Sequence, residues 1–318
     1  MKKVLVLGAT GGIGQPLVEE FVGRGISVIA FARSKDTLQN LYGGNPRVET
    51  WTGDALHAAD VMEASRGVDT IFHCVSIPYP EWTEKLERVA RNILEAAKAN
   101  GCKVVIIDNI YAYGRRQASR IAEQHPKNPH TCKGKLRLKV EQMILDSNKQ
   151  GIPSLHVHLP DFYGPTGANT MLNVTLQAIA SNRFGGFVGD QSIAREYIYL
   201  PDAARAIAEI ASRDTSYGQN WNVPGAGVIT GKEILRIGNE ITKKTARIMT
   251  ITKGMIGLLK LFSPFMKELH EMMYLTEEPL ILSGEKYERE IGPIPQTPYL
   301  QGIGETIRSL QTSMQNVK

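Results

Sequence analysis

Runs of apolar residues alternate with amphipathic segments over the first half of the chain. Residues 2–7, 27–32 and 103–107 are largely apolar runs, which are typical of parallel strands covered on both faces. Residues 15–22 and 84–100 carry apolar side chains at helical spacing, so each predicts a helix with one buried face. This alternation favours a doubly wound α/β fold around a parallel sheet. Further predicted strands span residues 48–51, 69–74 and 153–159, and further predicted helices span 38–42, 60–65 and 135–147.

A glycine-rich turn separates the first predicted strand from the first predicted helix. Glycines let the backbone turn tightly and approach a pyrophosphate, and the helix N-terminus offers free N–H groups to that anion. Because a second strand follows at residues 27–32, the context favours a dinucleotide site over a mere tight turn. The predicted contacts come from Gly8, Thr10, Gly11, Gly12, Ile13 and Gly14.

The second half of the chain has a different pattern. From about Pro160 the strict alternation fades, and loops rich in Gly, Pro and Asn appear. We predict a dinucleotide-binding domain over residues 1–159 and a smaller, mainly substrate-side lobe over 160–318, with some segments returning to the sheet. Residues 253–275 favour an apolar cap on the substrate pocket, the alternative being a basic amphipathic surface helix. Candidate helices span residues 172–182, 201–212 and 231–242.

Composition narrows the function classes. The chain has 318 residues, 42% of them hydrophobic, and a formal net charge of +5. The cationic residues are scattered rather than gathered in a stripe with aromatics, so we expect no nucleic-acid partner. Cys74, Cys102 and Cys132 are widely spaced, which favours reduced thiols and a cytoplasmic location. The first apolar run is too short for a signal peptide or a membrane span. We expect a small-molecule substrate and leave a homodimer open.

Several segments occur in an order typical of one enzyme family. The glycines of the first turn have the spacing G-x-x-G-x-x-G, and six further segments follow. Together they resemble the extended short-chain dehydrogenases/reductases, the group that includes nucleotide-sugar epimerases and dehydratases. The resemblance implies a Rossmann fold and NAD(P)-dependent reduction or epimerisation of a hydroxyl- or carbonyl-bearing small molecule, a nucleotide sugar among the candidates. The six segments are 53–55, 110–114, 161–165, 195–204, 218–223 and 287–307.

The resemblance also implies contacts to the adenine and to the back of the cofactor. Asp54 and Ala55 follow a predicted strand, and the resemblance implies that the Asp54 carboxylate accepts from the adenine amino group; a helix cap is the alternative. Cys74, Val75 and Ser76 end the next predicted strand, where the family backs the cofactor with small residues.

The cofactor itself has a local signal after the second strand. An NAD site usually places an acid there to hold the ribose 2′-hydroxyl, but here no acid precedes Asp36. Arg33 and Ser34 are suited to a 2′-phosphate through charge-assisted hydrogen bonds, unless Arg33 is simply a surface residue. We therefore predict NADP, with NAD as the alternative.

The resemblance fails at the family's catalytic Tyr-x-x-x-Lys. Aligning residues 140–142 on the family's usual run puts Lys133 at the tyrosine and Arg137 at the lysine. A slip by two residues puts Thr131 and Lys135 there instead. Neither register supplies the phenol, whose pKa a neighbouring cation would lower for general acid–base work.

Two functional readings follow from this departure. In the first, the chain is an atypical enzyme in which Tyr113, Tyr111 or Lys133 transfers the proton. Asn109 replaces the family's serine, and with Asp108 it would orient the substrate. In the second, the chain is a catalytically silent NADP-binding regulatory or scaffold protein.

Two other groups complete the sequence-based predictions. Asp161 and Arg195 lie in segments where the resemblance implies substrate contacts, the arginine holding a nucleotide-sugar phosphate, although a structural ion pair is the alternative. His156 and His158 share one strand face without an acid or cysteine at ligand spacing, so we predict packing roles and no metal site.

Overall fold

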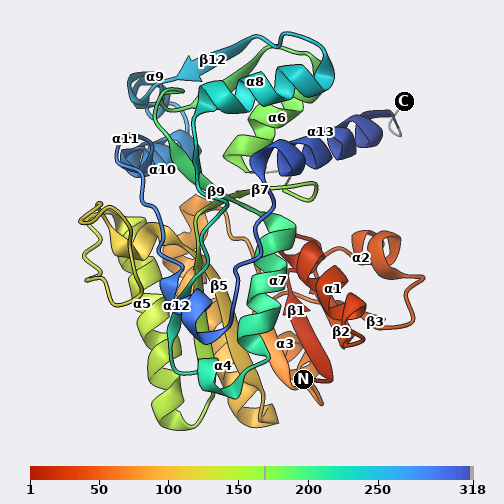
Figure 1. Ribbon diagram of the computed structural model, residues 1–318. Helices are drawn as coiled ribbons and strands as arrows, with labels where there is room; N and C mark the ends of the chain where they lie inside the picture. Colours follow the sequence, from red (N-terminus) through yellow and green to blue (C-terminus); the bar gives the residue numbers. More distant parts are fainter. Residues whose placement is uncertain (168–169, 316–318) are drawn as a thin grey trace.

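The computed structural model describes residues 1–167 and 170–315, and it contains a seven-stranded parallel sheet (Figure 1). The strand order is β10-β6-β5-β4-β1-β2-β3, so the chain starts in the middle of the sheet and winds outward in both directions. This confirms the predicted doubly wound α/β fold. The strands are β1 (Lys3–Leu7), β2 (Ser27–Ala32), β3 (Val48–Thr52), β4 (Thr70–His73), β5 (Lys103–Asn109), β6 (Ser154–Leu159) and β10 (Asn220–Asn222).

Helices cover both faces of this sheet because its strands are apolar on both. In β1, Leu5 and Leu7 pack with α3, α4 and α5, whereas Val4 and Val6 pack with α1, α2 and α7. The helices are α1 (Gly14–Gly23), α2 (Lys35–Tyr42), α3 (Ala58–Ala64), α4 (Trp82–Asn100), α5 (Cys132–Ser147) and α7 (Leu200–Ala211).

A second lobe stands over one end of the sheet (Figure 1). Its apolar core joins α6, α8 and α13 to two small sheets. Strand β10 and helix α7 follow much of this lobe in sequence yet belong to the main sheet and its covering layer. The lobe's elements are β7 (Asp161–Tyr163), α6 (Met171–Ser181), β8 (Gly185–Val188), β9 (Arg195–Tyr199), β11 (Val228–Ile229), α8 (Gly231–Thr242), β12 (Ile248–Ile251) and α13 (Tyr299–Gln315).

Residues 253–275 form a group of short helices beside the second lobe, at the upper left of Figure 1. Ser263 caps α10 by accepting a hydrogen bond from the Met266 amide, and Pro264 is its first residue, which ends the preceding segment. These elements are α9 (Lys253–Leu259), α10 (Pro264–Met272) and α11 (Tyr274–Glu277), and α12 (Glu285–Glu290) follows. Within the described residues, no helix is both long and apolar enough to cross a membrane.

Candidate active site

The glycine-rich turn has the tight geometry that its sequence predicts. The Gly8 backbone has a φ of 84°, and the Gly8 amide donates to the Phe31 carbonyl at 2.9 Å. A Cβ on Gly14 would lie 2.1 Å from the Gly8 carbonyl oxygen, so only glycine lets α1 start this close to β1. The Gly11 amide closes the turn by donating to Gly8.

The start of α1 leaves backbone donors for an anion. Among the described residues, no backbone carbonyl accepts from the amides of Gly12 and Ile13, and no side chain caps the helix. These amides lie at the carboxyl end of β1, the edge at which ligands bind in such sheets. Thr166 donates its hydroxyl to the Gly12 carbonyl at 2.7 Å, so the second lobe covers the turn. The arrangement is suited to a pyrophosphate.

The other predicted cofactor residues surround this turn. A Cβ on Gly8 would meet the Cys74 carbonyl oxygen at 2.7 Å, so the turn packs directly against the segment Cys74–Ser76. The Asp54 carboxylate accepts from the Leu56 amide at 2.9 Å, while His57 is the N-cap of α3. Asp54 therefore shapes the turn before the helix. It is not the helix cap, so the alternative interpretation of this residue was wrong.

Arg33 and Ser34 lie at the carboxyl end of β2. Ser34 caps α2, since its hydroxyl accepts from the Thr37 amide at 3.2 Å. Arg33 is exposed, so its guanidinium is accessible to a ligand at the N-terminus of that helix.

Lys133 and Arg137 lie one helical turn apart on α5. Lys133 is only 2% exposed, and its ammonium pairs with Glu268 and, at 3.1 Å, with Glu271, both on α10. Arg137 Nε lies 3.0 Å from Asp108 Oδ1, and its guanidinium is 4.1 Å from the centre of the Trp82 ring. Arg137, which one of the two alignments puts at the family's lysine, is therefore held between a carboxylate and an indole.

The slipped register receives different roles in the structure. Thr131 is buried and caps α5, where its hydroxyl accepts from the Gly134 amide at 3.0 Å. Lys135 is exposed. Lys133 thus lies over the Tyr79 ring and Arg137 contacts Asp108. By contrast, Thr131 caps the helix and Lys135 is exposed.

The end of β5 presents Asp108 and Asn109. Asp108 is buried beside His156, whose Nε2 lies 3.2 Å from Asp108 Oδ2. Burial opposes ionisation, yet Arg137 and His156 hold the pKa of Asp108 below its usual value. The Asn109 side-chain oxygen accepts from the Tyr111 amide at 3.0 Å and starts the short 3₁₀ helix Ile110–Tyr113.

A pair of tyrosines adjoins these residues. The hydroxyls of Tyr79 and Tyr111 are 2.6 Å apart, and Phe265 of α10 stacks on the Tyr79 ring. Burial raises the pKa of both phenols, and Arg137 opposes the shift. Sequence reasoning missed Tyr79; the available signal was its place in the short connection from the carboxyl end of β4 to α4, at the ligand-binding edge.

Tyr113 is enclosed in a different environment. Its hydroxyl donates to Asn222 Oδ1 at 2.8 Å, while its ring packs 4.9 Å from the His158 ring and 4.7 Å from the Lys127 ammonium. Burial raises its pKa. A role for Tyr113 in proton transfer remains a prediction.

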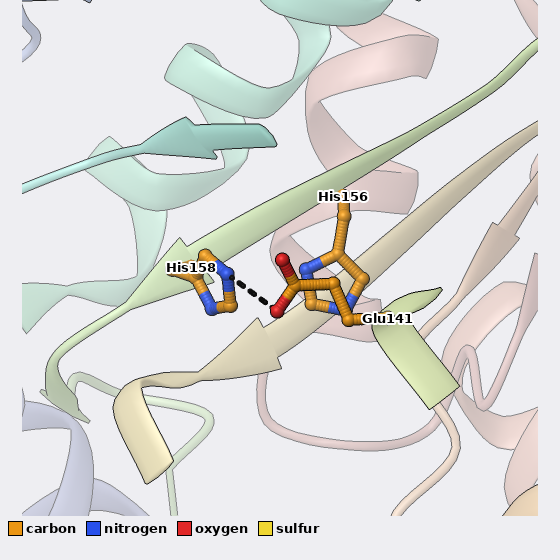
Figure 2. A group of neighbouring side chains, drawn as sticks. All are labelled: Glu141, His156 and His158. Atoms are coloured by element: carbon orange, nitrogen blue, oxygen red, sulfur yellow. Dashed lines mark ion pairs between the residues drawn. The ribbon is translucent and has the colours of Figure 1, made fainter. Parts of the chain in front are cut away.

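Glu141, His156 and His158 bring their ligand atoms within 4.8 Å of one another (Figure 2). The spacing of residues along the sequence did not reveal the Glu141 carboxylate as a possible ligand, because Glu141 lies on α5 and the two histidines lie on β6. Lys127 Nζ pairs with Glu141 and lies 3.0 Å from His158 Nε2, so a divalent ion would have to displace an ammonium. Although burial opposes it, the nearby His158 and the ammonium of Lys127 lower the pKa of Glu141. The prediction of no metal site stays a prediction.

The two predicted substrate residues lie on neighbouring strands of the second lobe. Asp161 starts β7, which pairs with β9, where Arg195 is the first residue. Arg195 is buried, donates to the Val188 carbonyl at 2.8 Å and stacks 4.6 Å from the Phe187 ring centre. Burial raises the pKa of Asp161, and the positive charge of Arg195 opposes this shift, so the two side chains interact electrostatically.

Known proteins share this architecture. The structure of UDP-glucuronic acid 4-epimerase from Bacillus cereus in complex with NAD matches with a TM-score of 0.81, at 17% identity, over 98% of this chain and 99% of that chain. A dTDP-glucose 4,6-dehydratase from Streptomyces venezuelae, solved with NAD, gives 0.81 at 19% identity over 98% of both chains. Such identities show a common fold.

Sequence similarity points to the same group. Bovine (Bos taurus) sterol-4-alpha-carboxylate 3-dehydrogenase, decarboxylating, is 34% identical over 111 residues, which are 33% of this chain and 30% of the bovine enzyme. The similar region thus spans under a third of that relative. The model of the NAD dependent epimerase/dehydratase family matches residues 4–223, more than half of the chain. The chain belongs to the NAD dependent epimerase/dehydratase family.

Proposed function

We propose that this chain is an NADP(H)-dependent oxidoreductase or epimerase-like enzyme that acts on a hydroxyl- or carbonyl-bearing small molecule in the cytoplasm. The observation that carries the proposal is the glycine turn at the carboxyl end of β1, where no backbone carbonyl of the described residues accepts from the Gly12 and Ile13 amides. Bound cofactor would supply or accept a hydride. The chain's own residues would hold its phosphates and ribose, orient the substrate and move a proton.

Arg33 supports the choice of NADP over NAD. It is exposed at the end of β2, beside the capped N-terminus of α2, and no acidic side chain precedes Asp36 there. A guanidinium and a helix N-terminus both attract a 2′-phosphate, whereas the 2′-hydroxyl of NAD would lack its usual carboxylate acceptor.

The test is a fluorescence titration of the protein with NADPH and NADH. We expect tighter NADPH binding, and we expect Arg33→Ala to weaken it by about 1.5–3 kcal/mol, roughly tenfold to a hundredfold, while leaving NADH binding unchanged. Arg116→Ala, at another exposed arginine, is the matched control for net charge and should leave both affinities unchanged. Tighter NADH binding, or an unchanged preference in Arg33→Ala, would contradict the NADP assignment.

For the reaction, Arg137 and Tyr111 are the residues best placed. Arg137 stands in the position of the family's ribose-binding lysine and is fixed by Asp108 and Trp82. Tyr111 follows Asn109 at the end of β5, and its hydroxyl already shares a hydrogen bond with Tyr79. We therefore place proton transfer at Tyr111, with Asn109 orienting the substrate; Tyr113 and Lys133 remain the other candidates.

Asp161 and Arg195 are the proposed contacts to the far end of the substrate. The Bacillus cereus neighbour is an epimerase of a UDP-sugar acid, and the bovine relative is a sterol dehydrogenase. A buried guanidinium beside a carboxylate can bind a phosphate or a carboxylate group, which both kinds of substrate offer.

One observation favours a second candidate function, a silent NADP-binding regulatory protein. Lys133, which replaces the family's tyrosine, is neutralised by Glu268 and Glu271. Burial also raises the pKa of Tyr111 away from the neutral range that suits acid–base catalysis. Measured turnover separates the two functions.

A further inference from the structure

The turn that joins α9 to α10 exposes an unusual density of large apolar side chains. We call residues 258–265 the α9–α10 tip; it lies at the upper left of Figure 1. Phe262 is 86% exposed, although phenylalanine is ordinarily buried. The exposed large apolar residues of the tip are Leu258 (70%), Leu259 (48%), Leu261 (73%), Phe262 (86%) and Phe265 (51%).

The tip is an ordered part of the fold. On its inner side Ile256, Leu269 and Met273 form a buried cluster. The amides of Leu261 and Phe262 donate to the carbonyls of Leu258 and Leu259, at 3.4 and 3.0 Å, and so close the turn. The exposure of the tip is therefore held in place by the structure and does not result from a frayed end.

Other exposed apolar residues in the described chain are scattered. Phe184, for example, is 71% exposed, but the two residues on each side of it in sequence are polar or glycine. Single exposed apolar residues are normal, whereas a contiguous apolar patch marks an interaction surface.

The charges around the tip indicate which partner fits. Lys260 lies within the tip and Lys267 lies on the following turn of α10, both exposed. The nearest acidic residues of α10, Glu268 and Glu271, are paired with Lys133. The exposed charges of the tip and of the turn that follows it are therefore positive, because the carboxylates of α10 are neutralised by Lys133.

We propose that the α9–α10 tip docks on the surface of an anionic phospholipid bilayer. Leu258, Leu261 and Phe262 would enter the boundary between headgroups and acyl chains, while Lys260 and Lys267 bind the phosphates. The cores of protein–protein interfaces are depleted in lysine, whereas lysines among leucine and phenylalanine suit a membrane surface, where the long side chain reaches the headgroups. This docking needs no membrane-spanning helix and is independent of the proposed reaction.

The test is co-sedimentation of the full chain with vesicles. We expect binding to vesicles of phosphatidylcholine mixed with phosphatidylglycerol, weaker binding to pure phosphatidylcholine, and loss of the difference at high salt. The double variant Leu261→Ser, Phe262→Ser should weaken binding by at least roughly tenfold. Lys260→Glu should weaken binding to the anionic vesicles only.

Phe184→Ser is the matched control, because it removes another largely exposed phenylalanine (71%, against 86% for Phe262) far from the tip in sequence; it should bind as the wild type does. Thermal melting checks that every variant is folded. We expect all of them to be folded, because the substituted side chains are exposed. Absence of vesicle binding by the wild type, or an equal loss in Phe184→Ser, would overturn the proposal. So would a double variant that still binds vesicles but dissociates a dimer in light scattering, since the tip would then bind a second copy of the chain.

Discussion

Lys133 is the residue that one of the two alignments puts at the family's catalytic tyrosine, and its contacts in the structure are those of a buried ion pair. Its ammonium joins α5 to two carboxylates of α10, and it lies 5.3 Å from the centre of the Tyr79 ring. Such an ion pair fixes the short helices over the end of the sheet. Beside that contact lie the hydroxyls of Tyr79 and Tyr111, 2.6 Å apart, and Tyr111 is the residue to which we assign proton transfer in our proposal.

These positions separate in a substitution series. Once a substrate is found, Tyr111→Phe should lower the single-turnover rate by roughly 10²–10⁴-fold, because a positioned acid–base group is lost, and should leave NADPH affinity unchanged. Lys133→Met should mainly lower stability, by about 1–3 kcal/mol, because it removes the cation that neutralises Glu268 and Glu271. Tyr113→Phe removes the hydroxyl that donates to Asn222 and tests the other candidate phenol; we expect it to change the rate by tenfold or less.

The measured rates distinguish the proposed enzyme from the regulatory protein. A drop of tenfold or less in Tyr111→Phe would remove Tyr111 from the reaction, and a large drop in Tyr113→Phe would move the proton transfer to the other side of β5. Clear NADPH binding by the wild type without turnover of sugar, steroid or aldehyde substrates would favour the regulatory protein. Rapid turnover of common carbonyl substrates would contradict the importance given to the missing tyrosine.

At the scale of elements, the junction of β1 and α1 depends on close backbone contact. Gly14→Ala would place a Cβ 2.1 Å from the Gly8 carbonyl oxygen, so the turn must move. We expect a loss of about 1–3 kcal/mol in the free energy of unfolding, as for other overpacked sites, together with loss of dinucleotide binding. Chemical denaturation and NADPH titration measure the two effects.

Gly23→Ala, at the other end of the same helix, is the control. A Cβ there meets nothing within 4 Å, so the substitution should be neutral or should stabilise α1 by up to about 1 kcal/mol. Equal behaviour of the two variants would show that the close approach at Gly14 has no energetic consequence.

Most elements could be predicted because their signals are local. The apolar runs became strands, and Gly101, with a φ of 69°, ends α4 as its position predicts. The predicted helix over 135–147 begins three residues later than α5, whose cap, Thr131, is one of the residues that the two alignments put at the family's tyrosine. A side chain that caps a helix and one that contacts a substrate are the same residue types, so local sequence does not distinguish them.

At the scale of the whole molecule, the site depends on contacts that sequence spacing does not encode. Lys133 meets residues of α10 more than 130 positions later, and Glu141 meets His158 from a different element. Sequence reasoning singled out Lys133 and His158 but did not identify Glu141 or the two α10 carboxylates as their partners. The glycine turn was predictable because all its contacts lie within one strand–turn–helix unit.

Glu196 gives the whole fold a predictable dependence on pH. It is buried on β9, and its carboxylate accepts from the Leu282 amide at 2.9 Å, which ties the second lobe to the segment before α12. Burial raises its pKa from 4.5 to about 8, against the opposing effects of that hydrogen bond and of Arg120. The folded state therefore retains a proton that the unfolded state releases. The contribution of Glu196 to stability is full below about pH 4.5 and is lost as the pH rises through about 8.

The carboxamide of Glu196→Gln can still accept from Leu282 but does not ionise. Measured by denaturant unfolding at about pH 5 and about pH 9, this variant should match the wild type at the lower value and exceed it at the higher one, by on the order of 2–4 kcal/mol. Glu95→Gln, at an exposed position, should follow the wild type at both. If wild type and Glu196→Gln lost stability in parallel with rising pH, the carboxylate would be ionised in the folded protein, and its burial between the lobe and the sheet would have to be relieved by a movement of the 282 segment.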